Sequence, residues 1–210
     1  MDERMISEFV TFLVVLDPLG MVPIFWAITH QVAPVHRRHI AVQGVFTATL
    51  ILIAFAFVGR GFMELFGITL PAFQIAGGIL LFLLSMDMIF ARQSGLRSTT
   101  DSEQEEALHK SDVAIFPLAF PLIAGPGAMT TVLLFSDRSE GTLRFIGTIG
   151  IMLFVLGLVL LCLLAANRIM RRMGETGTNA VSRLLGLILA ALSVQYVVDG
   201  IHGSFAVAGG

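Results

Sequence analysis

The chain is short of charged residues and of cysteine, and each shortage excludes a class of protein. Only 13% of its 210 residues are Asp, Glu, Lys or Arg, about half of the ~25% that is typical of soluble domains. With 56% hydrophobic residues and a mean hydropathy of +0.87, this composition indicates an integral membrane protein. The formal net charge of -2 argues against nucleic-acid binding. The single cysteine, Cys162, excludes an internal disulfide and a CxxC redox pair.

Motifs of the common membrane enzymes and pumps are also missing. No nucleotide-binding P-loop occurs, so the chain alone is not expected to hydrolyse ATP. His202 and Ser204 do not form the Ser–His arrangement of a rhomboid-like protease, and the signature of the aspartyl intramembrane proteases is absent. The cluster HRRHI at residues 36–40 is interpreted as a basic anchor rather than a metal site. We therefore expect no enzymatic activity, no metal and no cofactor.

The sequence contains six apolar windows of about 20 residues, each long enough to cross a bilayer. Backbone amides in lipid must be hydrogen-bonded within their own segment, so each window is predicted to be an α-helix. The fold class predicted from these windows is all-α, a polytopic membrane protein with six transmembrane helices. The predicted spans are residues 8–29, 39–59, 67–90, 113–135, 145–166 and 182–204.

One long polar segment, residues 91–112, separates the spans into two groups of three. Its Ser, Thr, Glu and Gln content is typical of a solvated linker. The chain is therefore divided into a first three-helix repeat (1–90), a cytoplasmic linker (91–112) and a second three-helix repeat (113–210).

Positive charges predict the orientation in the membrane, because Lys and Arg accumulate in cytoplasmic loops. The loops after the first, third and fifth spans hold more of them than the other side does, which predicts that both termini face outward. The two sets are Arg37, Arg38, Arg92, Arg97, Lys110, Arg168, Arg171, Arg172 and Arg183 against Arg4, Arg60, Arg138 and Arg144.

The two halves share sequence features at matching positions. PLGMVP at 18–23 corresponds to PLIAGP at 121–126, and GGILLFLLSMDM at 77–88 corresponds to LGLILAALSVQY at 185–196. Three is an odd number of spans, so a duplicated half must enter the membrane in the reversed direction. The result is an inverted repeat, as in many secondary transporters. The alternative is chance similarity between apolar helices.

Both matching segments carry residues that break helices. Pro18 and Pro23 flank Gly20 in the first span, and FPLIAGPGAMTT at 120–131 lies in the fourth. Irregular backbone persists at membrane depth only where protein or water satisfies it. Two breaks in inverted halves therefore predict a solute site near the midplane. The alternative is a pair of proline kinks without a ligand.

The residue types at the two breaks suit a zwitterion. A half-helix beginning near Gly125 would expose the N–H groups of Gly127, Ala128 and Met129 to a carboxylate. Asp17 could hold an ammonium group, a proton or a sodium ion, or it could only accept backbone N–H groups freed by the break. The predicted substrate-binding residues are Asp17, Pro18, Gly20, Pro23, Pro121, Gly125, Pro126, Gly127, Ala128, Thr130 and Thr131.

Two further polar residues occupy equivalent positions in the third and sixth spans. They are Asp87 and Gln195, and they could line the solute path or only mark a helix interface.

With these motifs in view, the sequence resembles the MarC family of prokaryotic membrane proteins. The motifs are LDPLGMVPIF, PLAFPLIAGPGAMTTV, GGILLFLLSMDMI and RLLGLILAALSVQYVVDGI, and the resemblance covers almost the whole chain. The family usually has Asn or Asp at the position of Asp17. It often has Asn where this chain has Met21, so residue 21 is not expected to supply a polar contact.

The resemblance implies a six-span protein of the bacterial or archaeal inner membrane, and some related proteins are similar to small neutral amino-acid transporters. The leading hypothesis is therefore a secondary transporter of small neutral amino acids, for which H⁺ and Na⁺ are candidate coupling ions. The alternatives are an exporter or channel for other small solutes or ions, and an accessory membrane protein without transport. The predicted partners are the lipid bilayer and a small solute. A homo-oligomer is consistent with the small size of the bundle, although no motif indicates one.

Overall fold

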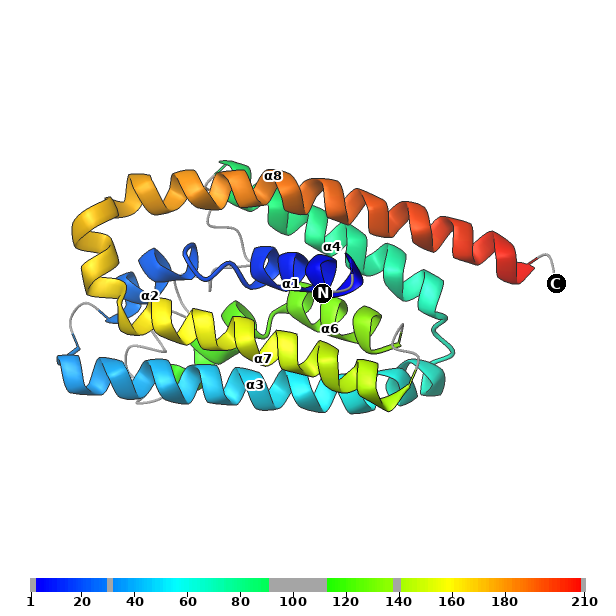
Figure 1. Ribbon diagram of the computed structural model, residues 1–210, viewed down its shortest axis with the longest axis horizontal. Coiled ribbons are helices and arrows are strands. Elements are labelled where there is room, and N and C mark those ends of the chain that lie inside the picture. Colours follow the sequence, from blue (N-terminus) through cyan, green and yellow to red (C-terminus); the bar gives the residue numbers. More distant parts are fainter. Residues whose placement is uncertain (1–2, 30–31, 91–112, 138–140, 209–210) are drawn as a thin grey trace.

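The computed structural model describes residues 3–29, 32–90, 113–137 and 141–208, and every regular element in this part of the chain is a helix (Figure 1). The predicted all-α class is confirmed. The predicted linker 91–112 lies outside the described residues. The elements are α1 (Glu3–Leu16), α2 (Met21–Thr29), α3 (Pro34–Leu65), α4 (Leu70–Phe90), the irregular helix η1 (Ala114–Ile123), α6 (Pro126–Asp137), α7 (Thr142–Leu164) and α8 (Ala166–Ala208).

The described helices are long and apolar enough for several membrane crossings. Five helical stretches qualify as spans, and a sixth is added if η1 and α6 form one span that is bent by 57°. Each predicted window falls on one of these stretches. Large apolar side chains such as Phe57, Phe154 and Leu161 are more than half exposed on the outer surface of the bundle. This pattern suits a protein that is surrounded by lipid.

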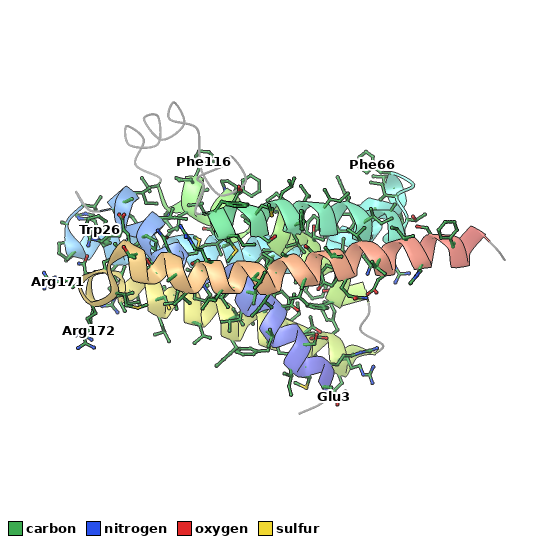
Figure 2. All side chains as sticks on the ribbon, turned by 90° about the horizontal axis from the view of Figure 1, so that it is seen from above. Glu3, Trp26, Phe66, Phe116, Arg171 and Arg172 are labelled. Carbon is green, nitrogen blue, oxygen red and sulfur yellow. The ribbon has the colours of Figure 1, made fainter. Side chains whose placement is uncertain are left out.

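The helix α8 changes direction near its start, at Gly174. This residue has φ 64° and ψ -177°, a backbone conformation that is essentially confined to glycine. The Thr178 hydroxyl donates to the carbonyl oxygens of Gly174 (3.1 Å) and Glu175 (3.0 Å) beside the bend. The segment 166–173 therefore crosses one end of the bundle, which we call the basic end because Arg171 and Arg172 project there (Figures 1 and 2). In Figure 2, Glu3 lies away from the basic end, below the middle of the bundle.

Beyond the bend, α8 runs beside α4 with very little space between the two backbones (Figure 1). A Cβ atom on Gly78 would lie 2.8 Å from the carbonyl oxygen of Ser193, and one on Gly200 would lie 2.9 Å from that of Pro71. Both distances are too short for a side chain. The two helices approach closely because small residues lie at their contact, as is common between membrane helices.

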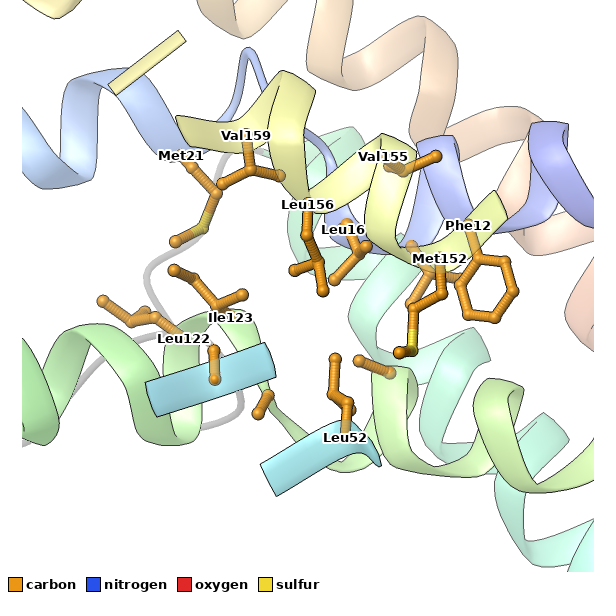
Figure 3. Close-up of a cluster of buried hydrophobic side chains, with 14 of the residues drawn as sticks. Phe12, Leu16, Met21, Leu52, Leu122, Ile123, Met152, Val155, Leu156 and Val159 are labelled. Carbon is orange, nitrogen blue, oxygen red and sulfur yellow. The ribbon is translucent and has the colours of Figure 1, made fainter. Parts of the chain in front are cut away.

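The apolar interior brings the two predicted breaks together. Leu16 and Met21, on either side of the first break, lie in one buried cluster with Leu122 and Ile123, which precede the second break (Figure 3). Each of these four side chains is at most 7% exposed. The packing of these side chains thus positions both irregular segments inside the bundle.

Candidate functional site

The first break lies between α1 and α2 and is centred on Asp17. The N–H of Asp17 still donates to the carbonyl of Leu13 (3.0 Å), and its own carbonyl accepts from the N–H of Met21 (3.1 Å). Between these bonds the backbone of Asp17 has φ 41°. Asp and Asn enter this left-handed region more readily than most residues. The helix therefore stops at Leu16 and restarts at Met21, where the two prolines and Gly20 predicted an interruption.

The Asp17 carboxylate is fully buried and joins the break to α8. Its Oδ1 atom accepts hydrogen bonds from the N–H of Gly20 (3.0 Å) and from the hydroxyl of Ser182 (3.5 Å). A side chain on Gly20 would overlap the carboxylate and lie 2.6 Å from the Ser182 hydroxyl oxygen, so only glycine fits. Asp17 thus acts as an N-terminal cap for α2, with a negative charge at the positive end of that helix.

The second break lies at Ala124 and Gly125, between η1 and α6. Phe116 and Phe120 have extended backbone within η1, as expected for residues that precede proline. A Cβ atom on Gly125 would overlap the carbonyl oxygen of Pro121. Pro126 occupies the first position of α6, where its missing N–H costs no hydrogen bond.

A small cavity lies at the N-terminus of α6. Its volume is about 20 Å³, which is room for one water molecule. Val15 of α1, together with Leu80 and Leu84 of α4, closes it on the side facing these helices. Residues 121–123 and 125–128 form the rest of the wall.

The cavity faces the positive end of α6. Gly127 and Ala128 are in the first turn, where backbone N–H groups have no acceptor within the helix. The N–H of Met129 donates to the carbonyl of Gly125 (3.0 Å), so the prediction that Met129 exposes its N–H group is wrong. The N–H groups of Gly127 and Ala128 and the positive end of α6 therefore lie at the wall of the cavity, which is an arrangement suited to an anion or to the oxygen of a water.

Five of the predicted substrate-binding residues line this cavity, namely Pro121, Gly125, Pro126, Gly127 and Ala128. The other six are Asp17, Pro18, Gly20, Pro23, Thr130 and Thr131, and they lie outside its lining.

The two threonines of α6 are turned to other neighbours. The Thr131 hydroxyl donates to the carbonyl of Gly127 (2.9 Å), and the methyl group of Thr130 faces Gly77 of α4. Gln195 donates to Asp199 (2.6 Å) on the exposed side of α8, and Asp87 is half-buried near the end of α4. Neither Asp87 nor Gln195 lines the cavity.

Sequence reasoning missed the apolar wall of the cavity. Val15, Leu80 and Leu84 are ordinary residues of apolar helices, and only the packing of α1 and α4 against α6 identifies them. The contact between Ser182 and Asp17 was also missed, because the two residues are far apart in the sequence. Within the described ranges, no group of three or more His, Cys, Asp or Glu side chains is placed to hold a metal ion.

Arg37 connects three elements at the basic end of the bundle. Its guanidinium donates to the carbonyl of Thr29 through Nε (3.2 Å) and Nη2 (2.8 Å) and to the side chain of Asn167 through Nη1 (2.5 Å). Thr29 is the last residue of α2, so a cation meets the negative end of that helix. Helix α2 is thus held by Asp17 at its start and by Arg37 at its end.

We expect Arg37→Gln to lower the stability of the protein by about 1–3 kcal/mol, because hydrogen bonds from a charged donor contribute about that much. Thermal unfolding in detergent micelles measures the effect as a lower midpoint temperature. The neighbouring exposed Arg38 offers a matched control, since Arg38→Gln removes the same charge without these bonds. Equal midpoints for the two variants would contradict the assigned role of Arg37.

The chain is similar to known membrane proteins over almost its whole length. A family model described as "MarC family integral membrane protein" matches residues 3–205. A UPF0056 membrane protein of Methanocaldococcus jannaschii is 38% identical and covers 95% of this chain and 96% of its own length. A UPF0056 membrane protein of Pyrococcus abyssi is 35% identical (95% and 94%), and the UPF0056 membrane protein YvbG of Bacillus subtilis is 32% identical (96% and 96%). No solved structure matches the chain.

Proposed function

Since the chain belongs to the MarC family of integral membrane proteins, whose members occur in bacteria and archaea, we propose that it is a secondary transporter of small neutral amino acids. The observation that carries the proposal is the cavity at the start of α6. There the N–H groups of Gly127 and Ala128 and the positive helix end suit a carboxylate in the apolar interior. Solute sites formed by discontinuous helices are typical of secondary transporters.

The pairing of helices supports an inverted repeat of two three-span halves. Helix α1 packs against α7, and η1 packs against α3. Helix α2 packs against α8, and α6 packs against α4. In an inverted repeat, α1 and α2 correspond to η1 and α6, while α3 and α4 correspond to α7 and α8. The contact of α1 with α7 then corresponds to that of η1 with α3, and the contact of α2 with α8 corresponds to that of α6 with α4. Each interrupted span therefore packs against the second and third spans of the other half. With η1 and α6 counted as one span, the described helices form six candidate spans.

We assign the basic end to the cytoplasm, because positive residues accumulate on that side of membrane proteins. Arg37, Arg171 and Arg172 lie at this end, and the C-terminus lies at the other. The C-terminus is then on the outer side of the membrane, and we assign the N-terminus to the same side from the distribution of Lys and Arg in the loops.

The ammonium group of the solute is assigned to Asp17, the one carboxylate in the described ranges that is fully buried. Two facts support this pairing. Val15, two residues before Asp17, lines the cavity, and Met21 beside the first break packs with Ile123 beside the second. The cavity has room for one water, so a solute enters only if α4 and its Leu84 move away from α6. A proton or sodium ion at Asp17 would couple the solute to an ion gradient.

The test is uptake of labelled glycine and alanine into proteoliposomes that contain the purified protein, with and without pH and sodium gradients. Gly127→Ala should lower the uptake rate by about tenfold or more, because contacts at a solute site are often worth 1–3 kcal/mol. The added methyl group would meet the side chains of Leu81 (2.9 Å), Leu84 (3.3 Å) and Val15 (3.7 Å), at the cavity wall. Their flexible ends can move, so the fold should be retained.

Gly150→Ala in α7 is the matched control, because an added methyl group there meets nothing within 4 Å. Its uptake should equal that of the wild type. Absence of gradient-dependent uptake of both amino acids by folded wild-type protein would refute the amino-acid proposal. Competition by other small solutes, or conductance of ions alone, would then decide between the remaining kinds of transport.

A further inference from the structure

One face of α4 packs along α6. This contact starts at the cavity and continues towards the end of the bundle that lies opposite the basic end. Gly127, in the first turn of α6, lies against Leu81 and Leu84 of α4. Thr130, one turn further along α6, lies against Gly77, one turn earlier in α4. The two helices are therefore antiparallel along this contact, which we call the α4–α6 contact. Gln74 is the next residue along the same face of α4, about 15 Å from Leu84 at 1.5 Å per residue.

The side chain of Gln74 is buried and incompletely hydrogen-bonded. Only 6% of the residue is exposed, and its Nε2 atom makes no hydrogen bond within the described part of the chain. A buried donor without an acceptor costs about 1–3 kcal/mol. An apolar residue of similar size would avoid this cost, so the presence of an amide here requires an explanation.

Between the level of the cavity and Gln74, the α4–α6 contact is closely packed at Gly77 and Thr130. A side chain on Gly77 would overlap Cγ2 of Thr130, so the backbone of α4 touches that methyl group directly. Threonine in a helix divides between two rotamers. A change of rotamer at Thr130 would therefore move a methyl group of the α4–α6 contact that lies between Gly127 and Gln74 along this face.

From these contacts we infer that the amide of Gln74 is a second binding position for the solute, between the cavity and the outer side of the membrane. Its Nε2 donor suits a carboxylate oxygen, the same chemical group that the N-terminus of α6 suits. The inference rests on the proposed transport function and deepens it. In this inference, the α4–α6 contact is the outer part of the transport path. Thr130 lies on this path between the cavity and the amide of Gln74.

The experiment compares Gln74→Met with wild type in two measurements, glycine uptake into proteoliposomes and thermal unfolding in detergent. Methionine is similar in length and apolar, so it removes the amide with little change in volume. We expect glycine uptake to fall by about tenfold or more, as for the loss of a hydrogen bond to a charged group. The unfolding midpoint should be unchanged or higher, because the unpaired donor is gone.

Gln195→Met is the matched control, since Gln195 is an exposed glutamine of α8 that is bonded to Asp199. It should leave the uptake rate unchanged. Wild-type uptake in Gln74→Met would overturn the inference and leave the proposed function standing. A joint fall of uptake and unfolding midpoint would identify Gln74 as a structural residue and also overturn it. Absence of uptake by the wild type would overturn the proposed function and this inference together.

Discussion

Replacement of Asp17 by Asn is expected to lower gradient-dependent glycine uptake by about 100-fold, the size of effect seen when one partner of a buried charge pair is removed. The fold should survive, because asparagine keeps an oxygen that accepts from the N–H of Gly20 and from the hydroxyl of Ser182. Asparagine also tolerates the positive φ of this position. Uptake and thermal unfolding, measured on the same preparation, separate the charge of Asp17 from its capping role.

Asp17→Ala provides the contrasting variant. It removes the cap, which costs about 1 kcal/mol, and it places alanine in the left-handed region, which costs a further ~1–2 kcal/mol. Its unfolding midpoint should therefore lie several degrees below that of Asp17→Asn. Asp199→Asn, a change on the exposed side of α8, should alter neither uptake nor stability. If Asp17→Asn transports as wild type does, with the same gradient dependence, Asp17 is a helix cap and takes no part in transport.

The second large effect is expected at Gly77, where the α4–α6 contact has no room for a side chain. Gly77→Ala would place its methyl group on Cγ2 of Thr130, with Cβ of Thr130 only 3.0 Å away. Forcing an extra methyl group into a packed interior costs about 1–3 kcal/mol. We expect a fall of that size in the stability of the protein in detergent, measured by thermal unfolding.

Thr130→Ser permits a double-mutant cycle at this contact, because serine lacks the methyl group that Gly77→Ala strikes. The double variant should recover part of the lost stability, with a coupling energy of about 1 kcal/mol. Gly157→Ala in α7 is the control, since a methyl group there meets nothing within 4 Å. Its stability should equal that of the wild type or exceed it, because alanine favours helix more than glycine does. Additive effects of the two α4–α6 changes would show that they do not touch.

The two breaks could be predicted because proline and glycine act locally. Pro18, Gly20 and Pro23 restrict or free the backbone whatever the rest of the chain does, and the interruption lies among them. The same reasoning predicted a half-helix that begins near Gly125, and α6 begins at Pro126. It was wrong for Met129, because the carbonyl of Gly125 already belongs to the first turn of α6 and accepts its N–H.

The features that depend on packing between distant segments could not be predicted. Leu84 at the cavity wall and Ser182 beside Asp17 are unremarkable in sequence, and their roles arise from the way α4 and α8 pack on the broken spans. The polar segment after residue 166 was outside the predicted spans. In the structure it is helical and bends at Gly174, because glycine alone accommodates the conformation at that point.

The length of α3 determines how deeply the molecule sits in its membrane. The helix has 32 residues, about 48 Å at 1.5 Å per residue, whereas the hydrocarbon core is about 30 Å thick. Its apolar stretch, residues 40–59, is bounded by the polar residues 36–39 and by the Arg60–Glu64 ion pair (3.2 Å). That stretch is also about 30 Å long and exposes Phe46 and Phe57 on its surface. Bilayers with longer acyl chains would create a hydrophobic mismatch along α3, so reconstituted activity should depend on lipid chain length.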